Sequence, residues 1–160
     1  MDGSSGVRRR RTAAVLAALL LAGGEARAAG PQVTARIAGI ERRVAGQGAV
    51  LVEMTVGAGG HVNAHVPTES FLVPTELRLR PAGGRALAVR YPDGELKRFA
   101  FWEEPLRVYA GTVVFEADVS LPGDGSGPIA LEGEVSFQAC SDAQCYPPAK
   151  VALSATLAPR

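Results

Sequence analysis

The chain of 160 residues has little of several features that would assign it to particular classes of protein. Its two cysteines cannot build a scaffold of several disulfides. Its formal net charge of +1 gives no reason to expect the basic face that nucleic-acid-binding proteins need. Aromatic residues make up only 6% of the sequence, but 47% of the residues are hydrophobic, which is too many for a disordered chain. The length fits one ordinary domain.

No apolar run reaches the roughly 20 residues that a membrane-spanning helix needs. The longest run, residues 13–22, follows four arginines at residues 8–11 and precedes the small-residue pattern Ala26-Arg27-Ala28. This is the three-part layout of a secretory signal peptide. We therefore predict that residues 1–28 are removed on export, and that residues 29–160 form a mature domain without membrane insertion. An uncleaved membrane anchor is the alternative.

After residue 30, apolar and polar residues alternate with a period of two along seven segments. The segments are residues 33–37, 50–56, 76–80, 87–91, 113–119, 131–137 and 151–157. Such alternation predicts strands with one buried and one exposed face, as in antiparallel sheets. Turns rich in glycine and proline separate them, at residues 57–60, 81–84, 92–94 and 121–125. No stretch keeps a helical period for three turns, so we predict an all-β fold, an immunoglobulin-like antiparallel β-sandwich.

Both cysteines, Cys140 and Cys145, lie in one short segment, residues 136–148. In an exported protein they can form a disulfide, and most such disulfides are structural. Closing so short a loop, however, contributes only about 2 kcal/mol of stability. The alternation that puts Phe137 and Ala139 on the buried face also puts Cys140 on the polar face. We therefore predict an accessible disulfide, which is a candidate for thiol exchange.

The sequence around the cysteines contains nothing that would strongly activate a thiol. Asp142 is the nearest charged residue, and no lysine or arginine precedes Lys150. Low thiol pKa values arise at helix N-termini or beside cationic groups, as in the Cys-x-x-Cys motif, which the four intervening residues exclude. We therefore predict a pair that accepts electrons from a stronger thiolate and passes them on.

This segment resembles a known family, the N-terminal periplasmic domain of the thiol:disulfide interchange protein DsbD. The resemblance rests mainly on Phe137-Gln138-Ala139-Cys140 followed by Cys145-Tyr146-Pro147-Pro148. Weaker matches are Gly60-His61-Val62-Asn63, Pro74-Thr75-Glu76-Leu77, Tyr91-Pro92 with Gly94, and Val108-Tyr109-Ala110-Gly111. It covers about residues 32–158 and implies an immunoglobulin-like sandwich located in the periplasm.

The resemblance implies that a thioredoxin-like partner reduces this domain, which then reduces periplasmic disulfide isomerases or cytochrome c maturation proteins. It implies that Cys145 forms the mixed disulfides and Cys140 resolves them, without a cofactor. A cap loop with an aromatic residue shields the pair in the family, and we place it at Phe101, Trp102 and Glu103. The membrane-spanning and thioredoxin-like sections of DsbD are absent from this sequence, so we expect a separate membrane electron-transfer protein as partner.

Two other interpretations remain open. In the first, the chain is a periplasmic binding or scaffold module and the Cys140–Cys145 disulfide is an inert staple. In the second, Met54, His61 and His65 bind a metal, although the two histidines lie among turn residues and not on a helix that would aim both at one ion. We expect no metal. A core position for Trp102 is as open as its place in the cap loop.

Overall fold

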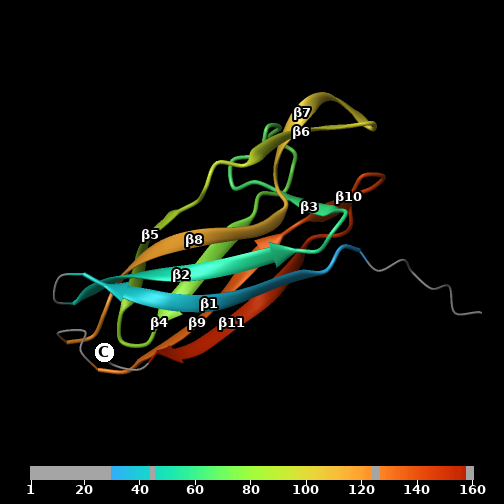
Figure 1. Ribbon diagram of the computed structural model, residues 1–160. Helices are drawn as coiled ribbons and strands as arrows, with labels where there is room; N and C mark the ends of the chain where they lie inside the picture. The colour runs from blue at the N-terminus through green and yellow to red at the C-terminus, as the bar shows by residue number, and fades with distance from the viewer. Residues whose placement is uncertain (1–29, 44–45, 124–126, 158–160) are drawn as a thin grey trace, which may run out of the picture.

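The computed structural model describes residues 30–43, 46–123 and 127–157. Every regular element in these ranges is a β-strand, and all the strand pairs are antiparallel (Figure 1). The predicted all-β, immunoglobulin-like fold is therefore confirmed. No helix in the described ranges is long and apolar enough to cross a membrane. The predicted signal peptide, residues 1–28, lies outside the described residues.

The strands form three sheets. The first contains, in spatial order, β1 (Val33–Arg42), β2 (Gln47–Val56), β8 (Gly111–Ser120) and β5 (Arg85–Arg90). The second contains, again in spatial order, β11 (Ala149–Leu157), β9 (Ile129–Phe137) and β4 (Glu76–Pro81). The third, which we call the distal sheet, runs from β10 (Ala139–Ser141) through β3 (Gly60–Asn63) and β7 (Trp102–Tyr109) to β6 (Glu95–Phe99).

The first two sheets form the sandwich body, in which β1 lies beside β11 and β4 turns into β5 (Figure 1). All seven predicted strands lie in this body. Their inward side chains make one core, and its fully buried members include Val52, Met54, Phe115, Leu131 and Val135. The long ladder between β2 and β8 runs from Gln47 opposite Ser120 to Val56 opposite Gly111. The turn from β4 to β5 uses Gly83 at a φ of 70°, a conformation that glycine adopts at low cost.

The distal sheet holds the four strands that the alternation did not predict. All four residues of β3 are buried, whereas four of the five residues of β6 are exposed, so neither strand alternates. Strands β6 and β7 form a hairpin, which we call the cap hairpin and which projects from one end of the body (Figure 1). A second, small core of Phe99, Leu106 and Val108 lies within it, with Leu72 packed against it.

Candidate functional site

Cys140 and Cys145 form a disulfide within a tight hairpin at the end of β10. The two residues lie directly opposite each other, with their Cα atoms 3.9 Å apart. Backbone hydrogen bonds flank the pair on both sides and none joins it directly. This is the non-hydrogen-bonded position of an antiparallel ladder, where opposite residues approach most closely. The short spacing of the cysteines therefore produces a cross-strand disulfide.

The turn between the cysteines is held by Ser141. Its N–H donates to the carbonyl oxygen of Gln144 at 2.8 Å, and its Oγ accepts from the N–H groups of Ala143 and Gln144 at 3.3 and 3.2 Å. On the other side of the disulfide, the N–H of Tyr146 donates to the carbonyl oxygen of Ala139 at 2.8 Å. These local bonds hold the two cysteines opposite each other.

The two cysteines differ strongly in exposure. Cys140 is 1% exposed, whereas Cys145 is exposed. Pro147 and Pro148 follow Cys145, and since proline has no N–H they cannot extend the ladder. Regular pairing resumes only at Ala149, the first residue of β11. Cys145 is therefore the half of the disulfide that a protein in solution can approach.

The predicted accessible disulfide is accessible at Cys145 only, because Cys140 is buried. As predicted, Phe137 and Ala139 join the core of the body, and Cys140 lies on the opposite face of the chain. In most strands of the body that opposite face meets water. At β10 this face is covered instead. The neighbouring strand β3 is buried throughout, and the ring of Phe99 from the cap hairpin stacks on His61 of β3. Alternation identified the correct face but not what covers it.

His61 lies opposite Cys140 on the neighbouring strand β3. The imidazole is 1% exposed and stacks on the ring of Phe99, with 4.2 Å between the ring centroids. Its Nδ1 is buried and has no hydrogen-bond partner among the residues that the structure describes. Burial, together with the nearby charge of Lys97, lowers the pKa of His61 to about 4, although Asp142 acts in the opposite direction. The imidazole is therefore neutral at neutral pH.

An exposed ion pair joins the cap hairpin to the disulfide hairpin. Lys97 Nζ lies 3.4 Å from Oδ1 of Asp142, which is in the turn between the cysteines. The same ammonium group lies 5.1 Å from the centroid of the Phe99 ring. Exposed pairs of this kind contribute little to stability. The sequence near the cysteines gave no sign of Lys97, because 45 positions separate it from Asp142.

The predicted cap residues lie at the tip of the cap hairpin. Phe101 is in the turn and stacks on Phe99, with 5.3 Å between the ring centroids. Trp102 begins β7 and meets Phe71 edge to face at 5.5 Å. It is 38% exposed, so its interpretation as a core residue is wrong. Glu103 lines, with both aromatic residues, a hollow of about 350 Å³. Phe99, which lies on His61, was not among the predicted cap residues.

The structure does not bring together the residues of the metal-site interpretation. Met54 is fully buried in the core of the body. His61 stacks on Phe99, whereas His65 stacks on Tyr91 with 3.7 Å between the ring centroids. Within the described residues, no three histidine, cysteine, aspartate or glutamate side chains gather as a metal site requires. The two histidines thus have separate aromatic partners.

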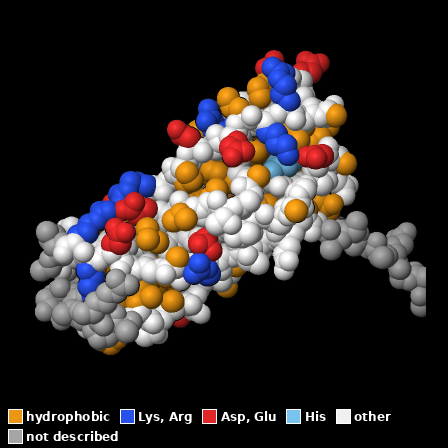
Figure 2. All heavy atoms as spheres, in the orientation of Figure 1, with side chains coloured by type: hydrophobic (Ala, Val, Ile, Leu, Met, Phe, Trp, Pro, Cys, Tyr) orange, Lys and Arg blue, Asp and Glu red, His pale blue; other side chains and the backbone are white. Residues whose placement is uncertain are grey.

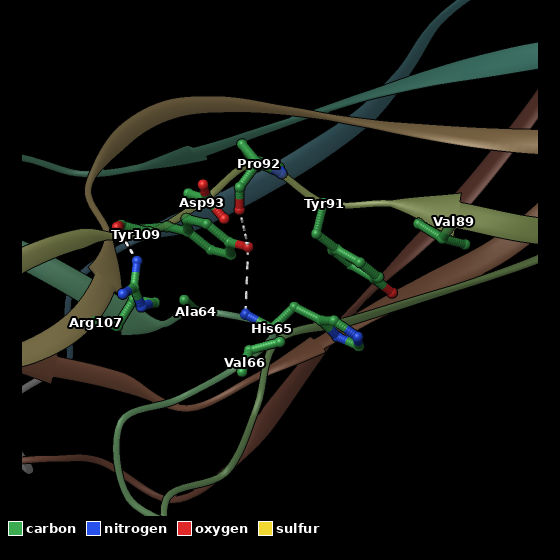
Figure 3. A pocket seen from close by; sticks show the side chains of 10 residues that line it. Ala64, His65, Val66, Val89, Tyr91, Pro92, Asp93, Arg107 and Tyr109 are labelled. Carbon is green, nitrogen blue, oxygen red and sulfur yellow. Dashed lines mark hydrogen bonds between the residues drawn. The ribbon is translucent and has the colours of Figure 1, made fainter.

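A pocket of about 240 Å³ lies beside His65 (Figure 3). The hydroxyl of Tyr109 donates to the carbonyl oxygen of Pro92 at 2.8 Å and accepts from the N–H of His65 at 3.2 Å. Arg107 donates to the carbonyl oxygen of Gly94 at 3.2 Å. These bonds hold the segment that joins β5 to β6. The pocket therefore belongs to the base of the cap hairpin, which carries Phe99.

Charges of both signs lie side by side over the sandwich body (Figure 2). Arg43 and Arg90 each pair with Glu116 and Asp118 of β8. The hydrogen bonds from Arg90 lower the pKa of both carboxyl groups. The basic groups of this patch are therefore matched by acidic ones on the same surface.

The sequence matches the family described as "Thiol:disulfide interchange protein DsbD, N-terminal" over residues 42–156. No curated protein matches it. The fold is similar to the crystal structure of the N-terminal periplasmic domain of ScsB from Proteus mirabilis, with 17% identity and a TM-score of 0.52, over 78% of this chain and 45% of that one. The N-terminal domain of Neisseria meningitidis DsbD in the reduced form matches over 76% of this chain and 87% of that one, with 16% identity and a TM-score of 0.43. The chain thus spans less than half of the ScsB domain, and that similarity establishes the fold alone.

Proposed function

Because the chain belongs to the family of N-terminal domains of the thiol:disulfide interchange protein DsbD, we propose that it exchanges disulfides with thioredoxin-fold proteins through Cys140 and Cys145. The observation that carries the proposal is the unequal exposure of the two cysteines. Exchange begins when a thiolate reaches one sulfur of a disulfide. The exposure of Cys145 permits that approach. The burial of Cys140 keeps an outside thiolate from its sulfur, which reacts only with Cys145 of the same chain.

The exchange transfers two electrons in two steps. A partner thiolate attacks Cys145 Sγ, a partner–Cys145 disulfide forms, and the bond to Cys140 breaks with its electron pair left on Cys140 Sγ. The second thiol of the partner then attacks its own bridged sulfur and releases Cys145 as a thiolate. The partner leaves oxidised, with an internal disulfide, and this domain is left with two thiols after proton uptake from water. Reduction of a target protein runs the same steps in reverse.

The cap hairpin controls access to the pair in this proposal. Phe99 lies on His61 opposite Cys140, and Lys97 reaches the turn between the cysteines. Exposed apolar side chains surround the same end of the molecule, and such clusters are typical of protein–protein contact surfaces. They are Val66, Phe71, Leu96, Phe101 and Trp102. We expect a partner to displace the tip of the hairpin, with Phe101, Trp102 and Glu103, when it docks.

The proposed setting is the periplasm, after removal of residues 1–28. There the domain, residues 29–160, acts as one component of a protein-disulfide reductase system. A thioredoxin-like donor, supplied by a separate membrane electron-transfer protein, reduces the domain. The reduced domain then passes the electrons to a periplasmic disulfide isomerase or to cytochrome c maturation proteins. Membership in the family of DsbD N-terminal domains supports this setting.

Trapping with two matched variants tests the roles of the cysteines. Cys140→Ser leaves the exposed Cys145 free. We expect it to form a stable mixed disulfide with a thioredoxin-fold protein whose second active-site cysteine is replaced by serine and whose remaining cysteine carries thionitrobenzoate as a leaving group, because no second partner thiol is then present to release Cys145. Cys145→Ser leaves only the buried Cys140 free, and we expect at least about tenfold slower trapping, because the rate depends on access to the sulfur. Non-reducing electrophoresis measures both. Equal trapping of the two variants would contradict the assigned roles.

The reduction potential separates an exchange disulfide from an inert staple. Equilibration of the domain with dithiothreitol or glutathione is expected to yield a value of about −270 to −120 mV, as for exchange proteins. A value below about −300 mV, the range of structural disulfides, would overturn the proposal in favour of a scaffold or binding module. Phe99→Ala and Lys97→Ala extend the test to the cap hairpin, because we expect both to speed reduction of the pair by dithiothreitol.

A further inference from the structure

Opening the disulfide leaves a negative charge on Cys140 Sγ, in a place that water does not reach. Cys140 is 1% exposed, and burial of an ionised group is costly unless the group is hydrogen-bonded or paired. The nearby ammonium group of Lys97 belongs to the surface and pairs with Asp142. A hydrogen-bond donor within the buried layer would therefore favour the step in which this charge forms.

Among the fully buried polar side chains of the described residues, His61 is the one with an unpaired polar atom; two buried nitrogens of the partly exposed Arg42 are also unpaired. The structure buries three polar side chains in the described ranges: His61, Asn63 and Thr75. Asn63 Nδ2 donates to the carbonyl oxygen of Val73 at 3.0 Å, and Thr75 Oγ1 donates to that of Asn63 at 2.6 Å. Within the described ranges, His61 Nδ1 has no hydrogen-bond partner. A buried polar atom left in this way in a folded protein calls for an explanation.

The position of His61 supplies that explanation. It is the direct partner of Cys140 in the ladder between β3 and β10. Side chains directly opposite each other on antiparallel strands leave the same face, with their Cβ atoms about 4.5–5.5 Å apart. Stacking on Phe99 fixes the plane of the imidazole beside that face. The imidazole of His61 and the sulfur that receives the charge therefore lie on the same buried face of the distal sheet.

We propose that His61 is a catalytic residue, whose imidazole N–H donates a hydrogen bond to Cys140 Sγ as the disulfide opens. This inference rests on the proposed exchange function. A neutral imidazole carries one N–H, and burial keeps His61 neutral at neutral pH by lowering its pKa to about 4. The charged groups that face it are Lys97 of β6, which favours the neutral ring, and Asp142 of the turn, which opposes it. No proton leaves His61 in the step, because it stabilises the thiolate by hydrogen bonding alone.

Reaction of the reduced domain with the aromatic disulfide 5,5′-dithiobis(2-nitrobenzoate) isolates this step. Cys145 attacks first and releases one thionitrobenzoate. Cys140 then attacks Cys145 Sγ, re-forms the internal disulfide and releases the second, so the domain loses two electrons and the reagent gains them. The second release requires the Cys140 thiolate, which a hydrogen bond favours. Its rate as a function of pH, followed by stopped-flow absorbance, is the measurement.

In His61→Phe, which keeps an aromatic ring against Phe99 but has no N–H, we expect the pH profile of the second release to move upward by about one pH unit or more. The first release should be unchanged. His61→Gln restores a donor and should recover part of the wild-type profile. His65→Phe, the matched control at the other histidine, should leave both releases unchanged. A wild-type profile in His61→Phe would overturn the inference while leaving the exchange function intact, and a wild-type domain without a second release would overturn both.

A measurement on the unmodified chain guards against a variant that does not fold. The imidazole resonances of His61, followed by NMR, should show one inflection near pH 4 in the oxidised domain. In the reduced domain a further inflection should appear at the pH where the second release reaches half of its plateau rate, because the ring then meets a thiolate. Identical titration curves in the two redox states would overturn the inference.

Discussion

The sandwich body and the distal sheet are both built from antiparallel strands, but they bury different kinds of side chain. Strands of the body are mostly long and alternate, so one face of each joins a single core and the other meets water. Strands of the distal sheet are mostly short, and β3 is buried on both faces between the body and the cap hairpin. The body thus makes a large dry core, whereas the distal sheet encloses a histidine and half of a disulfide.

The two regions therefore differ in how much they contribute to the stability of the domain. A large core contributes most of the free energy of folding, because hydrophobic stabilisation grows with the buried apolar area. The second core has only Phe99, Leu106 and Val108, so less stability depends on it. A region of low local stability can open for a partner without unfolding the domain. Under the proposed exchange function, the cysteine pair thus lies in the region that opens at the lower cost.

The same substitution in the two regions should have unequal effects, and this is the largest contrast we expect. Leu131→Ala in β9 removes a side chain that is 1% exposed from the main core, and should lower the free energy of unfolding by about 4 kcal/mol. Leu106→Ala in β7, where the residue is 4% exposed, should cost about 2 kcal/mol, because its small cluster can collapse. Urea denaturation measures both. If Leu106→Ala lowered the free energy of unfolding as much as Leu131→Ala or more, the two regions would not differ in stability as we infer.

Removal of the disulfide should have a moderate effect. The loop between Cys140 and Cys145 is short, with a sequence separation of 5, so its closure contributes only about 2 kcal/mol in the chain-entropy account. Cys140→Ala combined with Cys145→Ala should therefore still fold, with the lower urea midpoint expected from that loss. Reduced wild-type protein is the comparison. A double variant that fails to fold would show that the distal sheet supports the body.

Acid should act on the distal sheet first, through His61. Its folded pKa of about 4 lies below its ordinary value of 6.5, so the unfolded chain binds the proton more readily. Stability is present above pH 6.5 and falls as the pH drops through the window from 6.5 to 4, with a loss of up to about 2 kcal/mol by pH 5. Urea midpoints at a series of pH values measure it. His61→Phe should lack this slope, and the same slope in that variant would assign the loss to other groups.

The smallest effect should come from the exposed charges of the body. Hydrogen bonds from Arg90 lower the pKa of Glu116 and Asp118, so the stability they contribute is present above the ordinary carboxyl pKa and is lost as the pH falls below it. Because these groups face water, salt screens them. Arg90→Ala should shift the urea midpoint slightly at low salt and not at high salt. A shift that persists in high salt would show that packing, and not charge, is involved.

Most strands of the body could be predicted because the burial of each strand follows its own alternation of apolar and polar residues. β5 is the exception, since its predicted inward residue Leu87 is 48% exposed. In β8, for example, Phe115, Ala117 and Val119 are fully buried while Glu116 and Asp118 lie between them on the surface, and that pattern is visible in five consecutive residues. Strands β3 and β6 have no such pattern, because one is buried throughout and the other is almost entirely exposed. Their partners, not their own residues, decide that they are strands.

For the site, the sequence by itself determined the pair of cysteines, their close spacing and the face on which Cys140 lies, because all three depend on residues next to each other in the chain. The tertiary structure alone decided what covers that face. His61 from β3, Phe99 and Lys97 from β6 and Asp142 from the turn meet there across long stretches of chain. Such contacts depend on how the sheets pack. The alternation of residues along a strand shows on which face a residue lies, but not which distant segment covers that face.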